Sequence, residues 1–230
     1  MSRNLTSLAA AIESYLGHPG SITEVVSLST GYSNETYLLR GPDIVLRTPP
    51  AGKGLLPPYD MRRQHDVLAE VRDNVPGVPV PQVHGCSEDG SLIGAPFYLC
   101  DYVPGESFEL AAPHWLVDAS PEFRRGMCEQ WIDAVAALHR AAPLPSLGAA
   151  RTPVSVYRAW RELAAVDAEV GGAATAQGGA VVAMLDEVLA RGLESSGPPA
   201  PVHGDPKIGN TMWQDGRLTA LLDWELAFNG

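Results

Sequence analysis

The spacing of apolar residues predicts a strand-rich region at the start of the chain. Residues 4–16 place apolar side chains on one helical face, and Gly17 is suited to end that helix. Three short segments rich in Val, Ile, Leu, Thr and Tyr follow, at residues 22–28, 35–39 and 43–48. Because short turns separate them, we expect an antiparallel meander.

A second helix and two more strands complete this region. The helix is expected at residues 61–71, and the strands at residues 78–84 and 97–103. The sequence Val-Pro-Gly at residues 103–105 then interrupts the pattern. We therefore place a boundary there, with an N-terminal lobe at residues 1–103 and a C-terminal lobe at residues 104–230.

The second lobe is expected to be mainly helical. Apolar residues spaced by three or four mark one long helix with a buried face: Phe123, Met127, Trp131, Val135 and Leu138. Two further helices are expected at residues 156–170 and 180–193, and residues 171–179 between them are interpreted as a mobile loop. Short strands return at residues 211–213 and 218–223. The pattern as a whole predicts an α+β protein.

Composition narrows the classes of function. The chain has 230 residues, of which 45% are hydrophobic and 19% charged, which is ordinary for a globular protein. Its net charge of −11 argues against general nucleic-acid binding and suits a cationic small substrate. The three cysteines are widely spaced, which predicts reduced thiols in a cytoplasmic protein without a zinc site. No apolar run approaches the roughly 20 residues of a membrane-spanning helix.

The segment His203-Gly-Asp-Pro-Lys-Ile-Gly-Asn210 carries the clearest chemistry. It follows a turn and precedes a short strand, so it is expected to be a loop that presents polar groups. Asp223 comes thirteen residues after Asn210, at the end of an apolar strand. Hard divalent cations take oxygen ligands, and magnesium commonly takes one or two carboxylates together with phosphate oxygens. These residues therefore predict a magnesium and phosphate site.

With these residues, the chain resembles the aminoglycoside phosphotransferase and choline-kinase-like family, whose members are relatives of protein kinases and phosphorylate small molecules. It is most similar to the subgroup related to the kinase-like domains fused to some acyl-CoA dehydrogenases. The resemblance implies a protein-kinase-like two-lobe fold, with an antiparallel-sheet lobe followed by a mainly helical lobe. It also implies ATP- and Mg²⁺-dependent transfer of a phosphoryl group to a hydroxyl of a small molecule.

The resemblance assigns roles within the loop. Asp205 matches the catalytic base, and Lys207 would neutralise charge on the transferred group. Asn210 and Asp223 match the metal ligands. His203 is interpreted as a residue that orients the loop in preference to one that transfers a proton.

The nucleotide-binding residues are implied in the same way. Residues 29–37 match the loop that covers the nucleotide, and Gly31, Ser33 and Asn34 are its candidate phosphate-binding positions. Arg47 stands where the family carries the base that binds phosphate. Cys100 and Tyr102 fall in the hinge that holds adenine.

One position departs from the family pattern. The helix at residues 61–68 normally supplies an acidic partner for the phosphate-binding base, but this chain has Gln64 there. Glutamine accepts a hydrogen bond and supplies no negative charge. We expect Gln64 to face Arg47 across the nucleotide cleft.

The resemblance also implies that relatives continue with further helices, which this chain would lack after Gly230. On that basis residues 218–224 are expected to leave apolar surface uncovered, which would favour self-association or a partner. The acceptor stays open among aminoglycosides, choline-like amines, sugars and hydroxyacyl compounds.

Two other functions remain possible at this point. A degenerate kinase-like module would bind nucleotide without turnover, and Gln64 together with the missing helices supports that alternative. A metal-dependent hydrolase would use His203, Asp205 and Asp223 as ligands. It is less favoured, because only one histidine lies near the acids.

Overall fold

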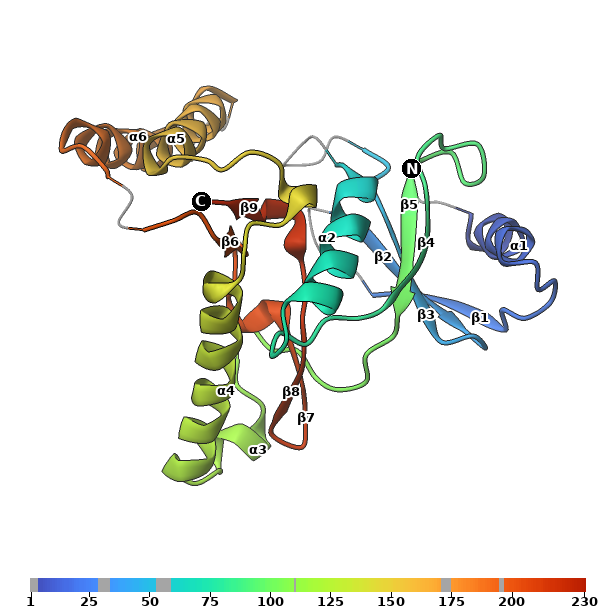
Figure 1. Ribbon diagram of the computed structural model, residues 1–230. Helices are drawn as coiled ribbons and strands as arrows, with labels where there is room; N and C mark the ends of the chain where they lie inside the picture. The colour runs from blue at the N-terminus through green and yellow to red at the C-terminus, as the bar shows by residue number, and fades with distance from the viewer. Residues whose placement is uncertain (1–3, 29–33, 53–58, 110, 171–174, 195–196) are drawn as a thin grey trace.

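The computed structural model describes residues 4–28, 34–52, 59–109, 111–170, 175–194 and 197–230 (Figure 1). Gly31 and Ser33, two of the expected phosphate-binding positions, lie outside these ranges. The strand-rich part forms a five-stranded antiparallel sheet with the order β1-β2-β3-β5-β4. Its strands are β1 (Glu24–Ser27), β2 (Glu35–Arg40), β3 (Ile44–Thr48), β4 (Val83–Ser87) and β5 (Phe97–Asp101).

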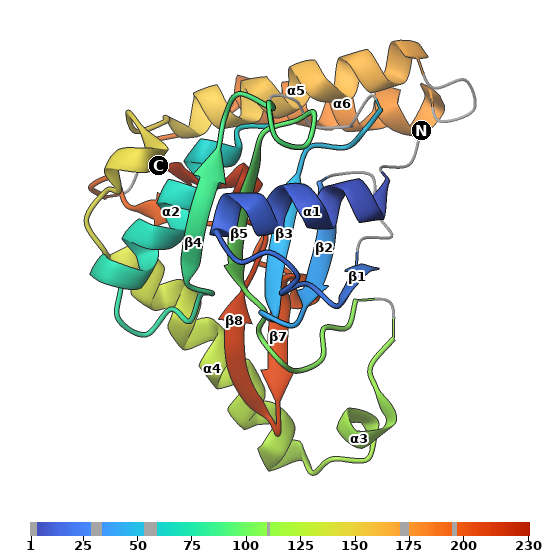
Figure 2. The same cartoon turned by 90° about the vertical axis from the view of Figure 1, so that its right-hand side faces the viewer.

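The alternation of side chains along the central strands covers both faces of the sheet. Leu39 and Leu46 pack with Leu8 and Ile12 of α1 (Leu5–Leu16) on one face. Their neighbours Leu38 and Val45 join the cluster that includes Val67, Leu68 and Val71 of α2 (Met61–Asn74). Figure 2 shows α1 lying across the near face of the sheet, with α2 behind it. The sheet is therefore held between two helices.

Both of these helices begin at a capping side chain. Asn4 accepts hydrogen bonds from the backbone N–H groups of Thr6 and Ser7 at the start of α1. Asp60 accepts one from the N–H group of Arg63 at the start of α2. These short polar residues satisfy N–H groups that have no partner inside the helix.

The remainder of the chain is mainly helical. Its helices are α3 (His114–Val117), α4 (Pro121–Arg140), α5 (Pro153–Val170) and α6 (Thr175–Ala190). Short 3₁₀ turns lie at η1 (Pro145–Leu147), η3 (Ile208–Asn210) and η4 (Trp224–Leu226). A hairpin of β7 (Thr211–Gln214) and β8 (Arg217–Leu221) packs against α4, and β6 (Pro201–Val202) pairs with β9 (Phe228–Asn229).

The two parts share one hydrophobic cluster. Leu68 and Val75 from the α2 region meet Leu138 of α4, Leu221 and Trp224 in a continuous core. The backbones of Glu106 and Trp213 are joined by two hydrogen bonds of 2.8 and 2.9 Å, which attach the connecting segment to the β7–β8 hairpin. Hydrophobic packing is continuous between the two parts of the chain. The lobe boundary expected after residue 103 therefore stays a prediction.

Several expected elements differ from the structure for physical reasons. The strand expected at residues 78–84 is β4 at Val83–Ser87, because Pro79 and Pro81 lack the N–H groups that a ladder requires. The buried side chains of Val78 and Val80 nevertheless belong to the core. Part of the loop expected at residues 171–179 is helical, since α6 already begins at Thr175, and residues 171–174 lie outside the described residues.

The expectation that residues 218–224 leave apolar surface uncovered is wrong for the central positions. Ala220, Leu221 and Trp224 are buried, with no more than 2% of each residue exposed. Helix α4 covers the hairpin, where Gln130 accepts a hydrogen bond from the Leu218 N–H group and donates one to the Gly216 carbonyl. Self-association was expected because of uncovered apolar surface at residues 218–224. It stays a prediction, but the burial of these side chains removes that reason for it.

Candidate active site

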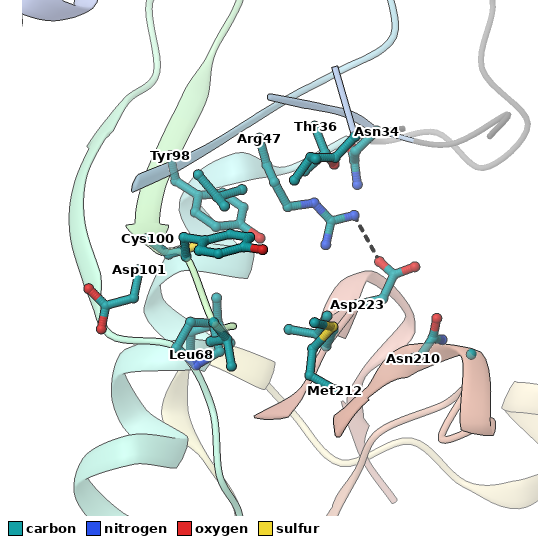
Figure 3. Close-up of a pocket in the computed structure, with 17 residues that line it drawn as sticks. Asn34, Thr36, Arg47, Leu68, Tyr98, Cys100, Asp101, Asn210, Met212 and Asp223 are labelled. Carbon is teal, nitrogen blue, oxygen red and sulfur yellow. Dashed lines mark hydrogen bonds and ion pairs between the residues drawn. The ribbon is translucent and has the colours of Figure 1, made fainter. Parts of the chain in front are cut away.

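A cavity of about 400 Å³ lies between the five-stranded sheet and the β7–β8 hairpin (Figure 3). The sheet contributes Val45 and Arg47 from β3, and the hairpin region contributes Met212, Leu222 and Asp223. Residues 100–103, which leave β5, line the same cavity. The pocket is therefore assembled from both parts of the chain.

One end of this cavity is apolar. Val45 lines it from the sheet, and Met212 and Leu222 line it from the other part of the chain. Cys100 lies at the edge, and burial raises the pKa of its thiol to about 12, so the side chain is a neutral wall. Tyr102 also lines the cavity. Two apolar surfaces beside an extended backbone segment suit a flat ring.

Two backbone N–H groups of this edge segment are already used by the protein. Asp101 donates its N–H to the Gln82 carbonyl at 2.8 Å, and Tyr102 donates its N–H to the Asp43 carbonyl at 3.2 Å. The Asp101 carboxylate pairs with Nε2 of His84 at 2.6 Å. These contacts hold the segment between β5 and the connecting loop in place.

The other end of the cavity is charged. Nη2 of Arg47 lies 3.0 Å from Oδ1 of Asp223, and their side chains are 14% and 29% exposed. Burial lowers the pKa of Arg47, but its interactions with Tyr98, Asp223 and Glu225 outweigh burial and leave that pKa raised. Arg47 is therefore a permanent positive charge.

The expectation that Gln64 faces Arg47 stays a prediction, and Gln64 is buried rather than exposed to solvent. Its buried side chain accepts a hydrogen bond of 3.4 Å from Nδ2 of Asn34, while Arg47 pairs with Asp223. The same Nδ2 of Asn34 donates to Oε2 of Glu225 at 2.7 Å. The acids that interact with Arg47 come from the segment after β8.

Glu225 contacts the cavity residue Asn34, and sequence reasoning gave it no role. The available signal was a second carboxylate two positions after Asp223, at the end of an apolar strand. Asp223 itself has a φ of 65°, a left-handed conformation that aspartate tolerates better than most residues. Asp223 directly precedes the 3₁₀ turn η4, which contains Glu225.

His203 is buried beneath the candidate catalytic loop. Its Nε2 lies 2.9 Å from the Leu222 carbonyl, and its Nδ1 accepts a hydrogen bond of 3.3 Å from the Asp205 N–H group. These partners select the neutral ring with its proton on Nε2. Burial lowers the pKa of His203 further, and the ring lies 4.5 Å from that of Trp224. The contacts support the interpretation that His203 orients the loop.

Asn210 holds Asp205 in position. Its Nδ2 donates to the Asp205 carbonyl at 2.9 Å and to Oδ2 of the Asp205 carboxylate at 3.0 Å. The Asn210 carbonyl accepts from the Leu222 N–H group at 2.7 Å, which brings it beside Asp223. Lys207 Nζ lies 2.7 Å from Oε1 of Glu109 and 3.7 Å from Oδ2 of Asp205. The hydrogen bond to Glu109 raises the pKa of Lys207.

Two further features fix the course of this loop. Gly204 has a φ of +87°, and a Cβ atom there would lie 2.3 Å from the Leu226 carbonyl oxygen. Only glycine fits that approach without displacement. Trp131 of α4 donates its Nε1–H to the Pro206 carbonyl at 2.9 Å. The loop is thus held from both sides.

A metal ion in this cavity would be bound by the side-chain oxygens that line it. Within the described part of the chain, no group of three or more His, Cys, Asp and Glu side chains is arranged to hold a metal. Asp223 and Asn210, which lie together in the cavity lining, could offer a carboxylate oxygen and an amide oxygen. That set suits Mg²⁺ completed by phosphate oxygens better than a transition metal held by the protein alone.

The comparison with solved structures defines the class of fold. The structure of APH(2″)-IIa with gentamicin aligns with a TM-score of 0.70 and 17% identity, covering 96% of this chain and 71% of that one. The ternary complex of APH(2″)-IIa with streptomycin and ATP gives a TM-score of 0.65 and 17% identity, covering 96% and 72%. The expected kinase-like α+β fold is confirmed.

The model of the phosphotransferase enzyme family matches residues 24–230, and the chain belongs to this family. Similar curated proteins are acyl-CoA dehydrogenase family member 10 of Mus musculus and member 11 of Gallus gallus, each 28% identical. The matches cover 96% and 97% of this chain. The chain spans only 21% and 28% of the length of those two relatives.

Among the described residues, no helix is both long and apolar enough to cross a membrane.

Proposed function

We propose that this chain is an ATP- and Mg²⁺-dependent phosphotransferase that acts on a hydroxyl of a small molecule. One observation carries the proposal. A single cavity brings the permanent cation Arg47 together with Asp223 and Asn210, and Asn210 is hydrogen-bonded to Asp205. Phosphoryl transfer needs little covalent chemistry from the protein and depends on positioning and electrostatics, which this arrangement provides.

The apolar end of the cavity would bind the base of the nucleotide. Val45 on one side and Met212 and Leu222 on the other would enclose adenine beside residues 100–103. The polar end then receives the phosphates, where Arg47 would bind their oxygens in a bidentate manner. Complexes of proteins with the same fold support this choice, since APH(2″)-IIa binds ATP and APH(4)-Ia binds ADP together with hygromycin B.

Unsatisfied groups at the polar end support a bound ligand. Nε of Arg47 and Oδ1 of Asn34 are buried and have no hydrogen-bond partner among the described residues. A buried polar atom without a partner costs free energy, so a ligand that supplies partners is favoured there. Asp223 and Asn210 would hold Mg²⁺. That ion, when bound, neutralises charge on the phosphate oxygens.

Asp205 would orient the acceptor and take its proton. The hydrogen bond from Nδ2 of Asn210 to Oδ2 of Asp205 fixes the direction of the carboxylate. An acceptor hydroxyl that donates to the carboxylate would have its oxygen aimed at the γ-phosphorus. Asp205 would receive the proton as the new O–P bond forms and the bond from that phosphorus to the departing ADP breaks. Lys207, 3.7 Å from the same carboxylate, would add positive charge beside the transferred group.

A titration of the purified chain with ATP, with and without Mg²⁺, tests the nucleotide half of the proposal. We expect Mg²⁺-dependent binding in calorimetry, and Asp223→Ala should abolish that dependence. A folded chain that shows no binding would refute the proposal.

An acceptor screen with Asp205→Asn then tests the chemistry. We expect ATP binding to be retained while turnover falls by a factor on the order of 10²–10⁴, the usual contribution of a general base. Undiminished turnover would show that Asp205 has another role.

A degenerate nucleotide-binding module is the second candidate. It is favoured by Gln64, which replaces the expected acid of α2 and contacts Asn34. It predicts the same binding titration with no phosphate transfer to any acceptor in the screen.

A further inference from the structure

A short segment that follows β5 lies against the candidate catalytic loop. The hydroxyl of Ser107 donates a hydrogen bond of 2.6 Å to the Gly209 carbonyl, although the residues are 102 positions apart. Gly209 also lies close to Glu109, since a Cβ atom on Gly209 would be 2.8 Å from the Cβ atom of Glu109. Two backbone hydrogen bonds to the β7–β8 hairpin hold the start of the same segment. Residues 106–109 are therefore fixed along the loop.

This segment places the Glu109 carboxylate beside Lys207. Nζ of Lys207 lies 2.7 Å from Oε1 of Glu109, which is a hydrogen-bonding distance, and 3.7 Å from Oδ2 of Asp205. The longer separation is an ion pair without a hydrogen bond. Glu109 therefore holds the ammonium group, and the held ammonium faces Asp205.

The exposure of the pair argues against a role in stability alone. The side chains of Lys207 and Glu109 are 46% and 55% exposed, and ion pairs between such exposed groups contribute little to folding. A lysine side chain is long and flexible, and it loses conformational entropy when its end is fixed. Without Glu109, the ammonium of Lys207 would spread over many positions in solvent. The contact thus determines where a positive charge lies.

The choice of lysine at this position is informative, because lysine is rare in the chain. Only two of the 16 basic residues are lysine, Lys53 and Lys207, and the other 14 are arginine. An ammonium is a compact charge with three hydrogens, so it can donate to one carboxylate and still face another. A guanidinium presents a planar and more rigid set of donors. Lysine at position 207 therefore suits a charge that is held by Glu109 and directed at Asp205.

We propose that Glu109 is a positioning residue for phosphoryl transfer, which holds the Lys207 ammonium beside the Asp205 carboxylate where the phosphoryl group is transferred. This inference rests on the proposed function, because that function places Lys207 next to the reacting groups. Glu109 acts through Lys207. It neither takes the proton of the acceptor nor binds the nucleotide.

Glu109→Ala tests this role in steady-state kinetics with Mg²⁺–ATP and an acceptor identified in the screen. We expect kcat to fall about tenfold, because the charge of Lys207 is no longer held in place, while KM for the acceptor and Kd for Mg²⁺–ATP are unchanged. Glu109→Gln keeps an acceptor oxygen at the same reach, so its kcat should fall only about threefold.

Glu88→Ala is the matched control for these kinetics. Glu88 and Arg62 form an ion pair whose side chains are 62% and 44% exposed, close to the values for Glu109 and Lys207, and neither residue lines the cavity. We expect no change in kcat for this variant. An equal fall in kcat for Glu88→Ala would overturn the inference, because the loss would then follow from any exposed ion pair.

A second substitution shows whether Glu109 acts through Lys207. Lys207→Met removes the charge and keeps most of the length of the side chain. In a chain that carries Lys207→Met, the added Glu109→Ala should cause no further fall in kcat. A further fall of about tenfold would show that Glu109 acts on the acceptor directly, which overturns the inference.

Nuclear magnetic resonance of lysine provides a readout that does not depend on activity. A chain labelled with ¹³C-lysine gives two Cε signals, and Lys207→Met identifies the signal of Lys207. We expect Glu109→Ala to shift this signal and to leave the signal of Lys53 and the thermal unfolding midpoint unchanged. A Lys207 signal that does not shift would overturn the inference, because Glu109 would then not hold the ammonium in solution.

The outcomes separate this inference from the proposed function. If the original chain transfers phosphate and Glu109→Ala leaves kcat unchanged or raises it, Glu109 has no positioning role and the proposed function stands. If kcat, nucleotide affinity and the unfolding midpoint all fall together, the pair is a structural contact and the inference is refuted. If the original chain transfers phosphate to no acceptor, the proposed function fails, and a shifted Lys207 signal then identifies a structural contact only.

Discussion

Arg47 and Asp223 are 176 positions apart in the chain, and their side chains form an ion pair with Nη2 3.0 Å from Oδ1. The arginine comes from β3 in the centre of the sheet, and the aspartate follows β8 on the opposite side of the cavity. Each neutralises the other in this structure. A phosphate and a metal ion bound at this end of the cavity would compete with the pair for the same two side chains.

The Arg47–Asp223 pair leads to a prediction for Asp223→Asn. Asparagine tolerates the φ of 65° at this position, so the backbone is retained while the charge is lost. We expect the free energy of unfolding, measured with urea in the absence of nucleotide, to fall by about 2 kcal/mol, less than for a fully buried pair. Asp186→Asn in the exposed pair with Arg161 is the control and should have little effect. Equal effects of the two variants would contradict this account.

The buried His203 predicts a dependence of stability on pH. Burial lowers the pKa of His203 from its ordinary value of 6.5, so the unfolded chain takes up this proton at a higher pH than the folded chain. The contribution of neutral His203 is complete above about pH 6.5 and is lost as pH falls toward the folded pKa, by at most about 1.4 kcal/mol per pH unit. Urea unfolding at a series of pH values from about 8 to about 5 measures this contribution to the free energy of unfolding.

His203→Asn is the reference for that pH profile. Its amide can still donate to the Leu222 carbonyl, but it does not titrate. The difference in unfolding free energy between the original chain and this variant should shrink as the pH falls. A difference that is constant with pH would show that His203 does not titrate as described.

Gly204 predicts a steric effect within the candidate catalytic loop. In Gly204→Ala the Cβ atom would meet the Leu226 carbonyl oxygen at 2.3 Å, so the backbone must move. We expect a loss of about 2–4 kcal/mol in the free energy of unfolding, together with reduced turnover, because Asp205 is the next residue. Gly192→Ala is matched in φ, at +77°, but has no atom within 4 Å of the added carbon, and should cost only about 1–2 kcal/mol. Similar losses for both variants would assign the effect to φ alone.

Trp131 predicts a change in turnover without a change in nucleotide affinity. Trp131→Phe keeps an aromatic ring but removes the hydrogen bond from Nε1 to the Pro206 carbonyl, which holds the loop next to Asp205. We expect kcat to fall about tenfold through misplacement of the carboxylate, while the Kd for Mg²⁺–ATP is unchanged. Trp160→Phe on α5, where Trp160 is 41% exposed, is the control. A comparable fall in kcat for Trp160→Phe would exclude a specific role of the loop contact.

Local patterns in the sequence were sufficient to predict most of the elements. Successive side chains of a strand point to opposite faces of the sheet. Leu38 and Val45 therefore lie on one face, and their neighbours Leu39 and Leu46 lie on the other. The spacing marked the buried face of α4 at Met127 and Leu138, whereas Phe123, expected on the same face, is 42% exposed. Boundaries were less predictable where prolines interrupt a strand, as before β4.

The partners of the polar residues were harder to predict. The contacts of Asn34 with Gln64 and with Glu225 had no local signal in the sequence. The burial of Leu221 and Trp224 depended on how α4 and the α2 region cover the hairpin. Sequence spacing describes one segment at a time, whereas each of these contacts joins segments that lie far apart along the chain.

The sequence by itself determined which segments become strands and helices, because backbone sterics and the periodic placement of apolar side chains act over a few residues. It also determined the chemical groups available in the loop from His203 to Asn210. Only the tertiary structure decided that Arg47 pairs with Asp223 and that Asn34 joins Glu225. Electrostatic and hydrogen-bond partners are selected by distance and burial, and both quantities exist only once the sheet and the β7–β8 hairpin have packed around one cavity.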